Sequence, residues 1–264
     1  MSHKFSQEFY SKNLNINFTT IDCPEKNLPN KDYFVEEISE LVSSSWGYYD
    51  KDKIKNVFLK LDQIILGRKG KELCFITGGK WKKIIYEGKY YMVYRVGLTV
   101  VRKYSANGEY LWNRGLMSLG TLILIKKAAM IRFLSPFYIC LRTLEPVIFH
   151  YITKKLNYVL PDINRKKFPT QIEKKIILEM SREINPDCDV DIDKLVIKGA
   201  FKNNLKLAKE KLKHLDNFDD ENIKTFFKEN IDYNRGDAFL VLAKLTLWEL
   251  FCGQIFWYIK DRKL

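Results

Sequence analysis

The sequence has few of the side chains from which metal and disulfide sites are built. It contains three histidines and five cysteines, and no two cysteines form a Cys-x-x-Cys pair or stand at metal-ligand spacing from a histidine. We therefore expect no metal cofactor, and we expect the thiols to be reduced. No apolar run follows the charged N-terminal residues, so we predict no secretory signal peptide and a cytoplasmic protein.

Internal repeats and low-complexity linkers are also missing from the sequence. The 264 residues are 46% hydrophobic and 14% aromatic, which excludes a disordered chain and allows a large buried core. This length predicts one large domain or two small ones.

Acidic residues are outnumbered by basic ones, and the formal net charge is +13. Such a charge attracts anions, so a phosphate-rich cofactor, an acidic partner protein and an anionic membrane are candidate partners. The lysines and arginines are spread along the whole chain, which argues against nucleic acid. A lysine-rich, solvated surface without a partner is the alternative.

Helices and strands are predicted in a clear order for the first hundred residues. Apolar side chains at helical spacing predict helices over residues 31–45 and 51–62, the first of them capped by Asn30 or Asp32. Four β-rich runs, separated by glycine turns at Gly70, Gly78-Gly79 and Gly88, then predict an antiparallel meander: QIILGRK, KELCFITGGK, WKKIIYEGK and KYYMVYRVGLTVV. Gly97 interrupts the last run, which indicates a bulge or a close approach by another chain or ligand.

A small polar hinge, Ser105-Ala106-Asn107-Gly108, follows the meander. An apolar helix is predicted from about residue 109 to 133, then a buried strand over 137–143 and a helix over 146–156 that begins with proline. Because a helix separates the two strands, we expect them to be parallel. A glycine turn before a helix can present free amides to a phosphate; a plain turn is the alternative.

This order of elements resembles the GNAT acyltransferase superfamily, and so do the stretches VGLTVVRKYSANGEYL and CLRTLEPVIFHYITKK. The resemblance implies an α/β (α+β) fold with a mixed, mainly antiparallel sheet flanked by helices. It implies a core over residues 1–162 that binds an acyl thioester. Residues 163–264 would complete the sheet with late strands, GDAFLVLAKL pairing with DKLVIKGAF, and add a helical extension.

The same resemblance implies where the acyl donor, acyl-coenzyme A or an acyl-pantetheine carrier, would bind. Amides of the hinge would hold the pyrophosphate with help from two basic residues, and amides near the bulge would polarise the thioester oxygen. The implied donor-binding residues are Gly97, Leu98, Thr99, Val101, Arg102, Lys103, Ser105, Ala106, Asn107, Gly108, Glu109 and Tyr110.

Three residues near the predicted helix over 146–156 are implied as catalytic. Tyr151 is the candidate acid, with His150 beside it, and Glu145 is the candidate base. Each has a structural alternative: Tyr151 as an ordinary packed tyrosine, His150 as a surface residue beside it, and Glu145 as a favourable charge at a helix start. Cys140 lies on the predicted buried strand and is interpreted as packing rather than as a nucleophile.

Two C-terminal features remain open. Asp187, Asp189, Asp191 and Asp193 alternate with apolar residues, which favours a strand with one wet face over a calcium loop. The apolar stretch 245–259 is a core helix, a wall for a long acyl chain or an interfacial helix that touches a membrane.

The sequence thus predicts an N-acyltransferase that moves an acyl group, longer than acetyl, from a pantetheine thioester to an amine. One alternative uses an acidic acyl carrier protein in place of coenzyme A, because a carrier presents one phosphodiester and no adenosine, and a chain with a net charge of +13 would attract it. Another is a non-catalytic binding or membrane-associated protein with this fold, because Ser105 stands where the family has arginine or glutamine. The amine acceptor is not predicted.

Overall fold

The computed structural model describes residues 6–12, 14–46, 50–97, 99–111, 123 and 137–245. These residues belong to two compact units that are interleaved along the chain. The first unit holds the residues up to Trp81 and those between Val96 and Arg132. The second holds Lys82–Arg95 and the residues from Phe137 to Leu245.

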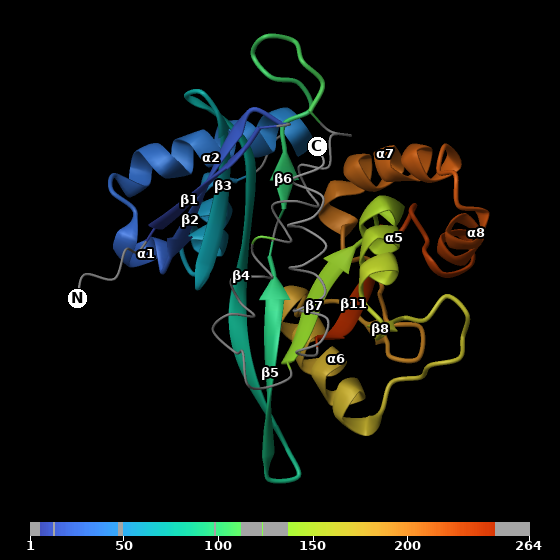
Figure 1. Cartoon of the computed structure of the whole chain (residues 1–264). Coiled ribbons are helices and arrows are strands. Elements are labelled where there is room, and N and C mark those ends of the chain that lie inside the picture. The colour runs from blue at the N-terminus through green and yellow to red at the C-terminus, as the bar shows by residue number, and fades with distance from the viewer. Residues whose placement is uncertain are drawn as a thin grey trace. The chain divides into compact units, whose positions relative to one another are not determined.

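In the described residues, the first unit is an antiparallel sheet with the helices α1, α2 and α3 (Figure 1). Its strands follow the order β1-β2-β3-β4, and β6 also pairs with β4. The elements are β1 Ser6–Ser11, β2 Ile16–Asp22, α1 Pro24–Asn27, α2 Lys31–Trp46, α3 Lys51–Phe58, β3 Gln63–Lys69, β4 Glu72–Tyr86 and β6 Val100–Val101. The β1–β2 hairpin is absent from the sequence-based prediction, whereas α2, α3 and β3 are confirmed.

Helix α2 supplies most of the helical side of this unit's core. The predicted apolar face is confirmed, because Phe34, Ile38, Leu41 and Val42 are all buried. They pack in one cluster with side chains of α3, β3 and β4. The Asn30 side chain accepts a hydrogen bond from the Tyr33 amide at 3.3 Å, so Asn30 rather than Asp32 caps the helix.

The predicted turn at Gly78-Gly79 is wrong, because β4 runs through both glycines without a break. A Cβ atom on Gly78 would lie 2.5 Å from the Leu61 side chain and 2.7 Å from the Gln63 carbonyl oxygen. Glycine is therefore required here by a close approach within the sheet and not by a reversal of the chain.

The second unit is a mixed sheet flanked by helices. The parallel pairing of β5 with β7 is confirmed, and β7, β11, β10 and β9 follow one another antiparallel. The two-residue strand β8 also pairs with β11. The elements are β5 Lys89–Val96, β7 Phe137–Thr143, α5 Pro146–Lys155, β8 Val159–Leu160, α6 Gln171–Ile184, β9 Val190–Asp191, β10 Val196–Ile197, η1 Lys202–Asn204, α7 Leu205–Asp216, α8 Glu221–Asn230 and β11 Ala238–Leu245.

An aromatic cluster fixes α5 in this unit. Phe149 of α5 stacks on Phe239 of β11 with ring centroids 5.7 Å apart, and it meets Phe227 of α8 edge to face at 5.4 Å. Phe226 of α8 stacks on Phe239 at 5.1 Å. Such ring pairs add to the free energy gained by burial, so the helix that carries Tyr151 has a defined position.

The fold class predicted from the sequence is confirmed: the sheet is mixed and mainly antiparallel, helices flank it, and the parallel pair is where a GNAT-like fold has one. The predicted pairing of the two late strands is also present, since Val196 pairs with Phe239 and Ile197 with Ala238, although α7 and α8 lie between these strands in the chain. The predicted apolar stretch after Leu245 lies outside the described residues. Among the helices that the structure describes, none is both long and apolar enough to cross a membrane.

The close approach at Gly78 generates a stability prediction. Gly78→Ala should lower the free energy of unfolding by about 1–3 kcal/mol, because the added methyl group meets backbone that cannot move aside without disturbing β3. Urea unfolding measures this. Ile85→Ala, at a position on the same strand that is 59% exposed, is the control and should cost less than about 1 kcal/mol. Equal losses in the two variants would contradict the packing explanation.

Candidate functional site

The polar hinge forms the closed tip of a small hairpin in the first unit. Tyr104 and Tyr110 form a β-bridge, and the Leu111 amide donates to the Lys103 carbonyl at 2.9 Å. Gly108 has a φ of +78°, which glycine adopts without strain. The predicted helix start at residue 109 is wrong, because residues 109–111 are extended.

The amides of this tip already have partners. The Ala106 amide donates to both carboxylate oxygens of Glu72, at 3.1 and 2.9 Å. The Ser105 amide donates to the Glu109 carbonyl, and the Gly108 amide donates to the Ser105 carbonyl, both at 2.9 Å. The Glu109 amide donates to the Ser105 hydroxyl at 3.2 Å. A carboxylate therefore takes the place that the sequence-based prediction gives to a pyrophosphate.

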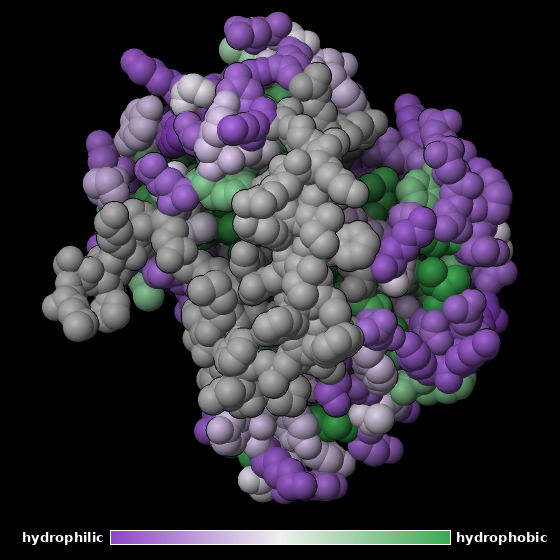
Figure 2. Space-filling view, in the orientation of Figure 1, coloured by the Kyte–Doolittle hydropathy of each residue, from purple (hydrophilic) through white to green (hydrophobic). Residues whose placement is uncertain are grey.

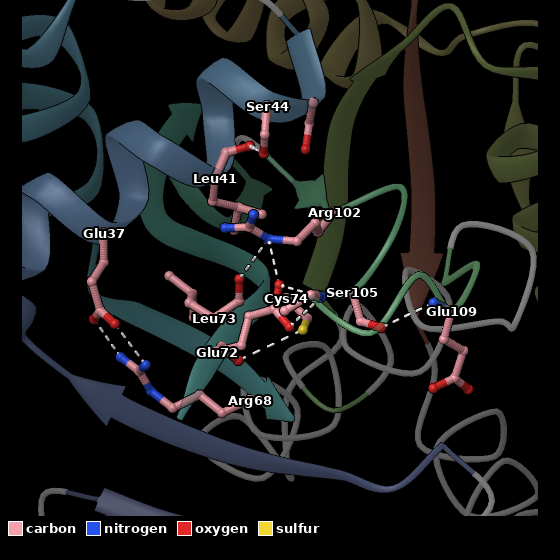
Figure 3. A network of polar contacts seen from close by, with 12 residues as sticks. Glu37, Leu41, Ser44, Arg68, Glu72, Leu73, Cys74, Arg102, Ser105 and Glu109 are labelled. Atoms are coloured by element: carbon pink, nitrogen blue, oxygen red, sulfur yellow. Dashed lines mark hydrogen bonds and ion pairs between the residues drawn. The ribbon is translucent and has the colours of Figure 1, made fainter. Parts of the chain in front are cut away.

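The basic residues beside the tip are engaged as well. Arg102 Nε lies 3.3 Å from both the Glu72 carboxylate and the Leu73 carbonyl oxygen, as Figure 3 shows. Lys69 and Glu109 form an ion pair, and the Lys103 ammonium lies over the Tyr104 ring at 6.0 Å. These contacts fasten the tip to the β3–β4 hairpin, so the geometry disfavours a phosphate cradle at residues 105–110.

The predicted irregularity at Gly97 is present. Strand β5 ends at Val96 and β6 begins at Val100, and between them the Gly97 amide donates to the Gly78 carbonyl at 2.6 Å. Because that amide is used, it is not available to polarise a thioester oxygen in this state. Thr99 shares a 2.7 Å hydrogen bond with Thr77. Leu98 lies outside the described residues.

The parallel pairing in the second unit is short. Strands β5 and β7 pair through Val93–Tyr138, Tyr94–Ile139 and Arg95–Cys140, and the pairing stops there. Strand β7 continues to Thr143, paired with β11 on its other side. Within the described residues, no strand pairs with this edge of β7 beyond Cys140. A strand edge of this kind can bind an extended molecule through its backbone groups.

Tyr151 and His150 follow β7 on α5. Tyr151 is half-buried, and this burial raises the pKa of its hydroxyl, so the side chain is a neutral proton donor at physiological pH. His150 contacts the start of α8 and the segment before it: its Nδ1 lies 3.3 Å from Asp220, the N-cap residue of α8, and its ring meets Phe218 edge to face. We interpret His150 as a contact between α5 and α8.

Glu145 is buried in an ion pair that the sequence-based prediction did not contain. Its carboxylate lies 2.6 Å from the Lys211 ammonium and 3.5 Å from His214 Nδ1, both on α7. Burial alone raises the pKa of Glu145, but the hydrogen bonds and charges of His214 and Lys211 outweigh it and hold the pKa below its ordinary value. A carboxylate with a lowered pKa is a weak base, which disfavours the predicted catalytic role.

Lys211 is the polar residue of this site that sequence patterns missed. It occupies the apolar face of α7, with Leu207, Ala208 and Leu215, and all four are buried. A lysine at an apolar helical position was the available signal, but the neighbouring lysines of the stretch KNNLKLAKEKLKHL concealed it.

The other candidates are structural. Cys140 is fully buried, and desolvation raises the pKa of its thiol to about 12, so it is a poor nucleophile. Asp191 caps a turn through the Lys194 amide, and Asp193 pairs with Lys174 at 3.2 Å. Within the part of the chain that the structure describes, no group of three or more His, Cys, Asp or Glu side chains could hold a metal ion.

No family model and no curated protein sequence matches this chain. Solved structures resemble it at low identity. One is a GCN5-related N-acetyltransferase from Kribbella flavida, with a TM-score of 0.38 and 12% identity over 54% of this chain and 34% of that chain. Another is aminoglycoside 6'-acetyltransferase type Ii, with a TM-score of 0.36 and 16% identity over 55% of this chain and 88% of that chain. A probable N-acyltransferase from Enterococcus faecalis scores 0.36 at 10% identity, over 65% and 44% of the two chains.

The match thus spans about a third of the Kribbella flavida chain. At these scores the likeness carries no conclusion about chemistry. The GNAT-like class of the fold is defined by the strand order and by the parallel β5–β7 pair.

The buried ion pair generates a prediction on stability and pH. Lys211→Met should lower the free energy of unfolding at neutral pH by about 3–5 kcal/mol, because it leaves the Glu145 carboxylate buried beside only His214. The double variant Glu145→Gln/Lys211→Met should recover most of this loss. Lys228→Met, which breaks an exposed pair with Asp216, is the control and should cost less than about 1 kcal/mol.

The sign of the pH effect follows from the lowered pKa of Glu145. The pair stabilises the wild type above the unfolded pKa of about 4.3, and this stabilisation is lost as the pH falls through the lower folded pKa. Urea unfolding in the acid range measures this loss of stability, which the double variant Glu145→Gln/Lys211→Met should not show. If the double variant lost stability with falling pH as steeply as the wild type does, the assignment to Glu145 would be contradicted.

Proposed function

We propose that this protein is a GNAT-like acyltransferase that moves an acyl group from a pantetheine thioester to an amine by direct attack. The observation that carries the proposal is the parallel β5–β7 pair, which ends at Arg95–Cys140 while β7 continues. The pantetheine arm binds as an extended segment along the free edge of β7. Its amide groups pair with backbone groups there, as an added strand would.

Tyr151 is the proton donor of this reaction. It lies on the helix that starts three residues after the end of β7, and a tyrosine hydroxyl is protonated at neutral pH and can donate to the leaving thiolate. Glu145 is assigned a structural role: its pair with Lys211 holds α7 against the start of α5. The catalytic base is not assigned to any of the predicted residues.

The amides of the hairpin tip already donate hydrogen bonds to Glu72 or to other groups of the tip, so the donor phosphates need other amides. The donor phosphates are therefore not assigned to any of the described residues.

An acyl carrier protein is the alternative donor, because a carrier presents one phosphodiester and the +13 chain attracts acidic proteins. A non-catalytic binding protein is the second alternative. Native mass spectrometry of the protein purified from its own host separates them. Bound coenzyme A would support the proposal. A bound, acylated carrier protein would support the first alternative, and a protein without either would support the second.

Tyr151→Phe should lower turnover by roughly 10²-fold and leave donor affinity unchanged, because the hydroxyl acts on the leaving thiolate and not on the bound ground state. Thiol release from acyl-coenzyme A with a panel of primary amines measures turnover, and calorimetry measures binding. Tyr158→Phe is the control: it also removes a tyrosine hydroxyl, but one that donates to Glu173 at 2.9 Å. Similar losses of turnover in both variants would sink the assignment of Tyr151.

The donor is proposed to carry an acyl group longer than acetyl, since the apolar stretch 245–259 suits a wall for such a chain. Each buried CH₂ contributes about 0.8 kcal/mol, so second-order rate constants should rise over the first added methylenes and then level off. A series of acyl-coenzyme A donors of increasing length measures this slope. Acetyl-coenzyme A outperforming every longer donor would leave an ordinary acetyltransferase.

A further inference from the structure

Helix α7 carries a row of exposed lysines that none of the preceding assignments uses. Lys206, Lys209 and Lys213 are exposed and recur at three- and four-residue spacing, so they share one face of the helix; we call this row the lysine stripe. The opposite face is buried through Leu207, Lys211 and Leu215. Figure 2 shows hydrophilic residues gathered over the side of the second unit where α7 and α8 lie.

The stripe differs from other lysines of this unit in its lack of acidic partners. Lys224 and Lys228 of α8 pair with Glu221 and Asp216, at 2.9 and 3.0 Å. Within the described residues, the three ammonium groups of the stripe form no ion pair and no hydrogen bond. Three unpaired like charges on one helix face repel one another, and an anionic partner would relieve this repulsion.

We propose that the lysine stripe is a docking surface for an acidic helix of a partner protein. The spacing supports this choice, because the three lysines follow one another at about 4.5 and 6 Å along the helix axis. Glutamates or aspartates three and four residues apart on a second helix have the same spacing. A helix laid along α7 can thus place one carboxylate opposite each lysine.

Two other anionic partners fit the surface less well. An amphipathic helix that binds a membrane needs exposed apolar side chains beside its lysines, and no large apolar residue of α7 is exposed. Nucleic-acid surfaces combine lysine with arginine or aromatic residues, and α7 has neither.

The stripe is coupled to the start of α5 within the same unit. Lys211, on the buried face of α7, contacts Glu145 at 2.6 Å, and Glu145 immediately precedes α5. A partner docked on α7 would therefore bind beside the helix that carries Tyr151. The proposal itself rests on the charge pattern and not on the proposed acyl transfer, so its test measures binding alone.

The test uses two synthetic stapled helical peptides of the same composition. In the first, three glutamates occupy one face at three- and four-residue spacing; in the second, the same glutamates are distributed around the helix. Fluorescence anisotropy should show that the wild type binds the first peptide about tenfold more tightly than the second, and that added salt weakens the binding.

Matched variants separate the stripe from the net charge of the chain. Lys206→Glu/Lys209→Glu/Lys213→Glu should lower affinity for the first peptide by about tenfold or more, whereas the corresponding lysine-to-arginine triple variant should retain it. Lys26→Glu/Lys31→Glu/Lys60→Glu changes the net charge equally at exposed positions of the first unit and should stay within about twofold of the wild type.

Three outcomes would overturn the proposal. The two charge-reversal variants could lose affinity equally, or the wild type could bind both peptides equally. Duplex DNA or phosphatidylglycerol vesicles could also bind more tightly than the first peptide in a stripe-dependent way, which would assign the surface to nucleic acid or to lipid.

Discussion

The contact between Gly97 and Gly78 is the constraint on which the path of the central strands depends. The Gly97 amide reaches the Gly78 carbonyl at 2.6 Å, and a Cβ on Gly97 would lie only 3.1 Å from that oxygen. Neither residue has a side chain to hold the two backbones apart. The chain can therefore leave β5 after Val96 and pair again with β4 as β6, where Val101 lies opposite Phe75. The end of β5 is thus set by sterics as much as by hydrogen bonding.

In the second unit, a buried ion pair rather than a contact between glycines fixes the position of the backbone. Glu145 and Lys211 are both more than nine-tenths buried, and each would be costly to bury alone. Together they connect α7 to the end of β7. Such a pair contributes little net stability compared with apolar side chains, but it penalises any arrangement in which one partner is displaced. This penalty makes α7 a helix with one defined register.

Local patterns in the sequence predicted the helices and strands whose formation depends on residues close together in the chain. Helix α2 followed from apolar spacing, and β7 followed from a short aromatic and β-branched run between prolines. The β1–β2 hairpin was missed because its sequence is mostly polar. Gly78-Gly79 suggested a turn because the side chain that excludes a Cβ belongs to Leu61, which is distant in the sequence.

Residues of the candidate site were likewise predictable only where the signals are close together in the sequence. Tyr151 could be placed on its helix because a strand, a proline and a helix follow one another there. The partner of the Ala106 amide could not be predicted, since Glu72 is 34 positions away, and the segment therefore resembled a free glycine turn before a helix. Lys211 lies still farther from Glu145 along the chain. Buried ionic contacts between distant segments leave no periodic pattern in a single sequence.

The aromatic cluster of α5, α8 and β11 has a consequence for the lifetime of the candidate site. A ten-residue helix such as α5 is marginal by itself in water, and its amides would exchange with solvent through frequent local opening. Phe149, however, is packed against both Phe227 and Phe239. Unfolding α5 must break these ring contacts, so its opening is tied to that of α8 and β11. Tyr151 therefore keeps its orientation for as long as this whole group of elements stays closed, a far longer time than the helix alone would provide.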